Sequence, residues 1–216
     1  MVVRRSDGGD DALALVLAAF ASGEPAVVPT DTVYGLMAPL AQPAAVARIF
    51  TIKHRPADQP LAVLVGHPSD LDLVAESTPA ARALAHRFWP GALTLVVAAR
   101  RGIGEALGAH DGTIGVRCAD DPLMRRITEA VGPVAATSAN LHGQPTPTTA
   151  QGIADQLGAS IMVLDGGARP APASAVVRIL DAEGGAIEVL RAGIIDPAEL
   201  VGVARQARPD TAEDSS

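Results

Sequence analysis

Apolar positions recur along this chain with two different spacings. Apolar residues three or four positions apart predict amphipathic helices, and short apolar runs between turn residues predict strands. The predicted helices are 10–21, 43–53, 79–88, 122–131, 149–157 and 197–206. The predicted strands are 25–29, 61–66, 92–99, 113–118, 133–137, 161–164, 174–179 and 186–191. The stretch 30–38 is expected to be a loop.

Strands and helices alternate through most of the chain, which predicts an α/β fold. The late strands follow one another without helices between them, and this indicates that part of the sheet is antiparallel. We therefore expect a twisted, mixed parallel and antiparallel sheet flanked by helices. No repeat or linker divides the chain. Residues 1–208 are expected to form a single domain, and residues 209–216 a disordered acidic tail.

Composition and charge exclude several classes of protein. With 48% hydrophobic and 19% charged residues, the chain is globular rather than disordered. The net charge of -7 argues against a basic coat for nucleic acid. A single cysteine, Cys118, excludes an intrachain disulfide and a multi-cysteine zinc site. The chain shows neither a signal peptide nor a run of membrane-spanning length, so we expect a cytoplasmic protein without a membrane partner.

The only lysine of the chain stands at the end of the second predicted helix. Val46, Ile49 and Phe50 form the apolar stripe of that helix, and Lys53 takes the next position of the stripe. Its ammonium is therefore expected to leave the helix from the buried side. One interpretation is a lysine that reaches water and complements the helix C-terminus. The other is an anion site, because Arg55 follows at once in a loop stiffened by prolines.

The predicted strand "TIGVRC" alternates strictly. One face carries Ile114, Val116 and Cys118, and the other carries Thr113, Gly115 and Arg117. The first face is expected to be core. On the second, a hydroxyl and a guanidinium flank a glycine that leaves room above the sheet. Arg117 either pairs with a structural carboxylate or binds a carboxylate or phosphate of a ligand.

Two loops, "PTDTVYGL" and "TSANLHGQP", each follow an apolar strand, and ligands commonly bind at strand ends in open α/β sheets. Their hydroxyl-bearing and small residues are Thr30, Thr32, Thr137, Ser138, Asn140 and Gly143. The same residue types favour ordinary turns, so spacing alone does not separate function from turn geometry. The phosphate-loop, dinucleotide and nucleophile-elbow motifs are absent, and the five histidines lack metal-ligand spacing.

Six segments in order resemble the YrdC family, whose members include L-threonylcarbamoyladenylate synthases. They are "VPTDTVYGL", "KHRPADQPL", "FWPGALTLV", "IGVRCADDPL", "VAATSANLHGQP" and "VLRAG". The resemblance covers about residues 29–193 and implies a twisted α/β sheet around one large electropositive cavity. It also implies that L-threonine, bicarbonate and ATP give threonylcarbamoyl-AMP and pyrophosphate. Downstream partner proteins then transfer the threonylcarbamoyl group to adenosine 37 of tRNA.

The resemblance also implies roles for individual residues. The L-threonine site is expected to contain Thr32, Arg117, Thr137 and Ser174. The ATP site is expected to contain Lys53, Arg55, Gln59, Thr113, Ser138, Asn140 and Arg191. Lys53 and Arg55 are the catalytic candidates, because the reaction requires aligned reactants and neutralised phosphates rather than a covalent nucleophile. Mg²⁺ is expected with the phosphates on chemical grounds, although the sequence shows no dedicated carboxylate pair for it.

The chain departs from the family pattern at His142, Ala175 and Ala192, which leaves local contacts open. Without a further C-terminal domain, the loop 165–174 is expected to be mobile and to close the cavity as a lid. One alternative is a non-enzymatic RNA-binding or ribosome-maturation module, which the acidic charge disfavours. Direct tRNA contact is expected to be weak at most. A second keeps the fold but forms a carbamoyl-adenylate from carbamoyl phosphate, which the single cysteine disfavours because such domains usually accompany zinc-finger-like segments. A third is a paralogue of the family with another activity.

Overall fold

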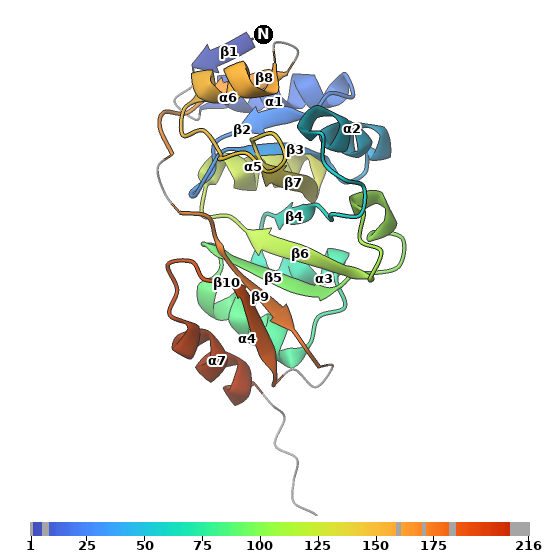
Figure 1. The fold of residues 1–216 in the computed structure, drawn as a ribbon, viewed down its shortest axis with the longest axis vertical. Helices are drawn as coiled ribbons and strands as arrows, with labels where there is room; N and C mark the ends of the chain where they lie inside the picture. Colours follow the sequence, from blue (N-terminus) through green and yellow to red (C-terminus); the bar gives the residue numbers. More distant parts are fainter. Residues whose placement is uncertain (1, 6–8, 159–160, 170–171, 182–184, 208–216) are drawn as a thin grey trace, which may run out of the picture.

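A single mixed sheet runs the length of the molecule (Figure 1). The computed structural model describes residues 2–5, 9–158, 161–169, 172–181 and 185–207, so the predicted tail lies outside the described residues. The strands are β1 (Val2–Arg5), β2 (Ala26–Val28), β3 (Gly35–Pro39), β4 (Ala62–Val65), β5 (Leu93–Ala98), β6 (Thr113–Cys118), β7 (Val134–Ser138), β8 (Met162–Asp165), β9 (Ala175–Ile179) and β10 (Ile187–Arg191). Their order across the sheet is β1-β8-β2-β3-β7-β4-β6-β5-β9-β10.

Helices cover both faces of this sheet. They are α1 (Asp10–Ala21), α2 (Pro43–Lys53), α3 (Leu71–Val74), α4 (Pro79–Phe88), α5 (Pro122–Val131), α6 (Ala150–Leu157) and α7 (Pro197–Gln206). The predicted starts of α4 and α5 are confirmed, because the side chains of Thr78 and Asp121 accept backbone N–H groups of the first turn. A proline follows each cap at the first helical position, where no N–H is needed.

The predicted mixed sheet is confirmed, but the antiparallel pairs are not confined to the late strands. The pairs β1–β8, β2–β8, β4–β6 and β5–β9 are parallel. The pairs β2–β3, β3–β7, β4–β7, β5–β6 and β9–β10 are antiparallel. Most antiparallel pairing therefore lies in the middle of the sheet, where β3 and β7 are each antiparallel to both of their neighbours.

The prediction of a loop over 30–38 is wrong in its second half. Residues Gly35–Pro39 form β3, which pairs with β2 on one side and β7 on the other. All five of its residues are buried, so the strand lacks the polar alternation that marks a half-exposed one. Its flanking glycine and proline also resemble turn residues. The short strand β1 and the single-turn helix α3 were not predicted either.

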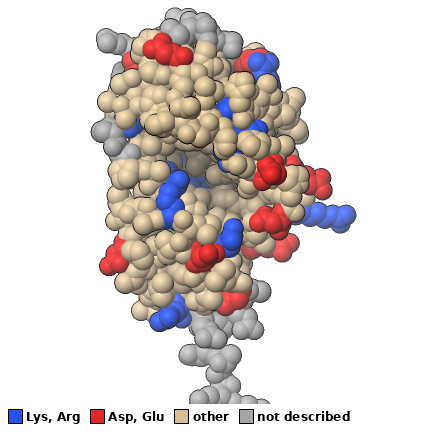
Figure 2. Space-filling model, viewed as in Figure 1, with Lys and Arg blue, Asp and Glu red and all other residues tan. Residues whose placement is uncertain are grey.

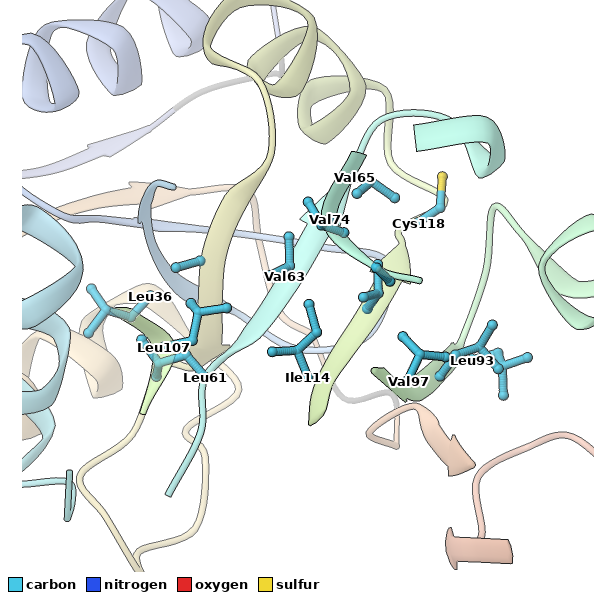
Figure 3. Close-up of a cluster of buried hydrophobic side chains, with 14 of the residues drawn as sticks. Leu36, Leu61, Val63, Val65, Val74, Leu93, Val97, Leu107, Ile114 and Cys118 are labelled. Carbon is cyan, nitrogen blue, oxygen red and sulfur yellow. The ribbon is translucent and has the colours of Figure 1, made fainter. Parts of the chain in front are cut away.

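Two hydrophobic clusters lie on opposite faces of the sheet. The larger contains residues of α2, α4, α6 and α7, and Figure 3 shows part of it, including Val63, Ile114 and Cys118. The smaller contains residues of α1 and α5 together with Met37, Leu64 and Ala136. Because Leu64 and Ala136 also border the cavity described below, that cavity lies on the α1/α5 side of the sheet.

Candidate active site

A cavity of about 620 Å³ opens on this side of the sheet. Figure 2 shows the hollow near the middle of the molecule, with basic side chains inside it and at its rim; those that line the cavity are arginines. Its volume is in the range of small-molecule sites. Its wall combines strand residues of β5, β6 and β9 with the loop 30–34, the end of β7 and Thr146 in the loop that follows it. The predicted large cavity is therefore present, and it extends along one face of these strands as well as over the ends of β2 and β7.

Alternation along three strands builds the cavity floor. The wall residues are Thr113, Gly115 and Arg117 from β6, Thr94 and Val96 from β5, and Val176 and Arg178 from β9. The opposite face of β6 is core, because Ile114, Val116 and Cys118 are fully buried. The predicted division of this strand into two faces is therefore confirmed. A Cβ on Gly115 would lie 3.1 Å from Thr94 Cγ2, so the glycine keeps this part of the cavity open.

Arg117 is buried at one side of the cavity, and each of its three side-chain nitrogens donates a hydrogen bond. It donates from Nε to the Gly91 carbonyl at 2.9 Å, from Nη1 to Thr32 Oγ1 at 2.8 Å and from Nη2 to Asp31 Oδ1 at 2.6 Å. Burial lowers the pKa of the guanidinium, and the Asp31 carboxylate opposes that effect. The structural carboxylate, one of the two interpretations of Arg117, is thus observed. Because the side chain also lines the cavity, a contact with a ligand remains open to it.

Arg55 and Arg191 line the same cavity without a carboxylate partner. Arg55 donates to the Gln59 and Pro60 carbonyls at 2.9 and 3.0 Å. Arg191 donates to the Ser174 carbonyl at 2.9 Å and to Ser174 Oγ at 3.3 Å. Within the described residues, neither guanidinium takes part in an ion pair. Burial lowers the pKa of both. The cavity therefore holds two positive charges that no carboxylate of the described chain neutralises.

Lys53 lies behind the cavity wall rather than in it. Its side chain is 1% exposed, and it is not among the wall residues. The ammonium donates to the backbone carbonyls of Ser138 and Asn140, at the end of β7. Burial, with the nearby charge of Arg55, lowers the pKa of Lys53 to about 8. The prediction that this side chain leaves the helix on its buried side is confirmed, and a direct phosphate contact stays a prediction.

Asn140 is similarly committed within its own loop. Its Nδ2 donates to the carbonyls of Leu141 and Gln144, both at 2.8 Å. Its Oδ1 accepts from the hydroxyls of Ser138 and Thr146. Those two hydroxyl residues line the cavity, whereas Asn140 is 8% exposed and does not. Asn140 is thus buried within this segment, and the two residues whose hydroxyls it holds line the cavity.

The structure brings most of the predicted site residues to one cavity. On the wall are Thr32, Arg55, Thr113, Arg117, Thr137, Ser138, Ser174 and Arg191. Lys53, Gln59 and Asn140 are not on the wall, and Gln59 contacts Arg55 through its backbone carbonyl. The sequence reasoning missed Thr94, Asp111, Thr146 and Arg178. Strand alternation could have indicated Thr94, which is the only polar residue of its strand, whereas no feature of the sequence marks Thr146.

The first half of the loop 165–174 is tied to the cavity rim. Tyr34 donates its hydroxyl to the Gly167 carbonyl at 2.7 Å and accepts from the Gly166 N–H at 3.1 Å. Arg169 donates to the Thr30 carbonyl at 2.9 Å. These bonds link the loop to the segment after β2. Movement of this loop as a lid stays a prediction, and residues 170–171 lie outside the described residues.

Neither a metal cluster nor a membrane span emerges from the described part of the chain. No group of three or more His, Cys, Asp or Glu residues gathers there in a geometry that could hold a metal ion. None of its helices is both long and apolar enough to cross a membrane.

Comparison with known proteins shows relatives of this chain. The model of the Sua5/YciO/YrdC family, described as telomere recombination, matches residues 18–193. A putative threonylcarbamoyl-AMP synthase of Mycobacterium tuberculosis (strain CDC 1551 / Oshkosh) is 38% identical over 190 residues, which cover 86% of this chain and 87% of the relative. The threonylcarbamoyl-AMP synthase of Bacillus subtilis (strain 168) is 39% identical over 162 residues, which cover 73% of this chain and 47% of the relative.

Solved structures share the fold. Pyrococcus abyssi Sua5 complexed with L-threonine superposes with a TM-score of 0.83 at 31% identity, and the match covers 94% of this chain and 60% of that chain. Escherichia coli YciO superposes with a TM-score of 0.77 at 22% identity, covering 90% of this chain and 95% of that chain, and supports the fold alone. The family model spans most of the chain, and the fold and cavity agree with it: this protein belongs to the Sua5/YciO/YrdC family.

Proposed function

We propose that this protein is an L-threonylcarbamoyl-AMP synthase. It forms threonylcarbamoyl-AMP and pyrophosphate from L-threonine, bicarbonate and ATP, for modification of adenosine 37 in tRNA. The observation that carries the proposal is the cavity itself. Its wall carries two guanidinium groups without carboxylate partners, those of Arg55 and Arg191, and two that are paired with carboxylates, those of Arg117 and Arg178. Relatives at 38% and 39% identity carry the synthase name.

The proposed threonine site centres on Arg117. A guanidinium already oriented by Asp31 and Thr32 suits the carboxylate of an amino acid, because its position is fixed before the ligand arrives. Thr137 and Ser174 line the adjoining wall, and their hydroxyls can donate hydrogen bonds to a polar substrate or accept them from it. The related Pyrococcus abyssi protein was solved in complex with L-threonine, which supports this substrate.

The proposed ATP site uses the remaining cations. Arg55 and Arg191 can neutralise phosphate oxygens, and the hydroxyls of Thr113 and Ser138 lie on the same wall. Gln59 contributes through its carbonyl, which holds Arg55 Nε. Lys53 and Asn140 lie behind these residues. Mg²⁺ is proposed only as the ion that accompanies the triphosphate, since the described residues gather no carboxylate cluster for a resident ion.

The chemistry requires little covalent help from the protein. The amine of threonine and bicarbonate first form a carbamate, with a new C–N bond and the release of one water. The carbamate oxygen then attacks the α-phosphorus of ATP, the bond between the α-phosphorus and the bridging oxygen breaks, and pyrophosphate leaves with the electron pair. Arginines fixed in a partly buried cavity stabilise the charge that develops on the phosphate oxygens. The same fixed positions align the reactants. The only cysteine is buried in the core, consistent with a reaction that uses no thiol nucleophile.

The test is pyrophosphate release from ATP and bicarbonate with L-threonine, with L-serine or with no amino acid. We expect release that depends on L-threonine, together with a product of the mass of threonylcarbamoyl-AMP. Folded protein that releases no pyrophosphate in response to an amino acid would instead favour a paralogue of other activity or an RNA-binding module. Titration of tRNA at several salt concentrations then separates those two, because RNA binding through phosphates weakens steeply with salt.

We also propose that residues 1–208 act as one catalytic domain and pass the product to separate transfer proteins. One sheet contains strands from Val2 to Arg191, which supports a single unit. The product is a mixed anhydride of a carbamate and a phosphate, so the protein that consumes it must accept an acyl group from an adenylate. Direct contact with tRNA is not required for the step proposed here.

A further inference from the structure

Two cations that stand two residues apart in the sequence have opposite environments. Arg55 lines the cavity, with its guanidinium tied only to backbone carbonyls. Lys53 is 1% exposed and lies outside the cavity wall. Burying an ammonium is unfavourable unless its donors are satisfied. Here the donors of the ammonium bond to backbone carbonyls of another segment, so Lys53 already has its hydrogen-bond partners before any ligand binds.

Three hydrogen bonds join Lys53 to the segment 138–142. Its ammonium donates to the carbonyls of Ser138 and Asn140, and its own carbonyl accepts from the His142 N–H at 2.9 Å. Helix α2 ends at this residue because His54 adopts a left-handed conformation with φ of 51°. The end of a rigid helix is thereby clamped to the loop through both its backbone and its side chain.

The clamped segment presents two hydroxyls to the cavity. Ser138 and Thr146 both line the wall, and both donate to Asn140 Oδ1. Asn140 in turn holds the carbonyls of Leu141 and Gln144 through Nδ2. The positions of both hydroxyls therefore depend on Asn140. The backbone carbonyls of Ser138 and Asn140 are in turn held by the Lys53 ammonium.

We infer that Lys53 is a positioning residue for the proposed reaction: it fixes the 138–146 segment so that the Ser138 and Thr146 hydroxyls face the substrates, while Arg55 contacts phosphate. The inference rests on the proposed function and adds Thr146 to the groups that contact substrate. Asn140 has the same positioning role from within the loop. Lysine suits this place because an ammonium supplies several donors to converging carbonyls, whereas an apolar side chain would leave two of them unsatisfied.

The experiment compares Lys53→Met with Arg55→Ala, alone and combined with Ser138→Ala. Misplacement of the loop predicts that Lys53→Met slows threonine-dependent pyrophosphate formation about 100-fold. Adding Ser138→Ala to Lys53→Met then changes the rate by no more than about 2-fold, because the hydroxyl is already out of position. Adding Arg55→Ala to Lys53→Met lowers the rate by the same factor as Arg55→Ala does alone, because the contact of Arg55 with phosphate does not depend on Lys53.

Binding of inorganic pyrophosphate by calorimetry supplies a readout that does not need turnover. Arg55→Ala is expected to weaken binding about 10-fold or more, as for loss of a charge-assisted contact. Lys53→Met is expected to leave the Kd within about 2-fold of wild type. Hydrogen exchange of the amides in 138–146 should accelerate in Lys53→Met and stay unchanged in Arg55→Ala.

Asn140→Ala guards against a Lys53→Met protein that fails to fold. It removes the acceptor that both hydroxyls share and leaves every cation in place. The same signature is expected: slow turnover, an unchanged pyrophosphate Kd and no further effect of Ser138→Ala. The inference is overturned if Lys53→Met weakens pyrophosphate as much as Arg55→Ala, or if Ser138→Ala multiplies the Lys53→Met defect. Absence of threonine-dependent turnover in wild type contradicts the proposed function instead, and the pyrophosphate comparison still decides the role of Lys53.

Discussion

Strands β5, β6 and β9 have two faces that differ in kind. One face is apolar and buried, with residues such as Leu95, Ile114 and Val177 in the larger cluster. The other carries hydroxyls and guanidinium groups and borders the cavity. Because side chains alternate along a strand, each of these short segments encodes core and site at once. A register slip of one residue would exchange the two, so stability and function depend on the same pairing.

Closing the cavity face should have the largest effect. In Gly115→Val the new side chain occupies the space above the sheet, where even a Cβ lies 3.1 Å from Thr94 Cγ2. We expect threonine-dependent turnover to fall about 1,000-fold, equivalent to about 4 kcal/mol of transition-state stabilisation, with little change in Tm. Steady-state kinetics and thermal melting measure the two quantities. Gly202→Ala is the matched control, because nothing lies within 4 Å of a Cβ there. Normal turnover in Gly115→Val would contradict the placement of the site.

The neighbouring position on the core face should behave in the opposite way. Ile114 is fully buried, and Ile114→Ala should lower the free energy of unfolding by about 3 kcal/mol through lost burial and a residual cavity. Turnover per folded molecule should stay close to wild type at a temperature well below the melting range. Denaturant unfolding measures the free energy of unfolding, and steady-state kinetics normalised to the amount of folded protein measure the turnover. A selective loss of kcat at unchanged stability would show that the two faces are not separable.

Cys118 gives a pH-dependent version of the same contrast. Burial raises the pKa of its thiol from 9.0 to about 11. Between those values the unfolded chain loses this proton and the folded chain keeps it, so the thiol's contribution to stability falls as pH rises. The stability of wild type relative to Cys118→Ala should therefore decline by about 2 kcal/mol between pH 8.5 and 11. Lys53 titrates equally in both proteins, so its effect cancels. A difference that is independent of pH would contradict the raised pKa.

The smallest effect is expected at Thr94, on the cavity face of β5. Its hydroxyl shares a 2.8 Å hydrogen bond with Ser174, a proposed threonine contact. Thr94→Val keeps the shape and removes that partner, so KM for L-threonine should rise about 5-fold. KM for ATP serves as the internal control and should not change. Equal changes in both constants would place Thr94 outside the threonine side of the cavity.

Periodicity predicted the parts of the fold that have a partly exposed face. The two faces of β6 and the caps of α4 and α5 follow from local sequence alone. The strand β3 was missed because burial on both sides removes the alternation by which strands are recognised. The central antiparallel pairs were not placed because register between distant strands is set by tertiary packing.

The cavity residues divide in the same way. Arg117 and Gly115 could be placed from strand alternation, and Arg55 from its loop. That Lys53 binds the carbonyls of Ser138 and Asn140 could not be inferred, since the partners are backbone atoms of a segment far along the chain. Asp31 was not recognised as the partner of Arg117 for a similar reason: only the pairing of distant strands brings the two together.

The strand order also governs when the site comes into existence. Ser174 and Arg191 belong to the last part of the chain, and β9 pairs with β5, which was made about eighty residues earlier. Such long-range pairing raises contact order and slows folding. During synthesis the helices and early strands can form locally, whereas the cavity lacks a wall until β9 and β10 have left the ribosome. Substrate binding is therefore a property of the finished chain, and ligand protection should report completion of folding.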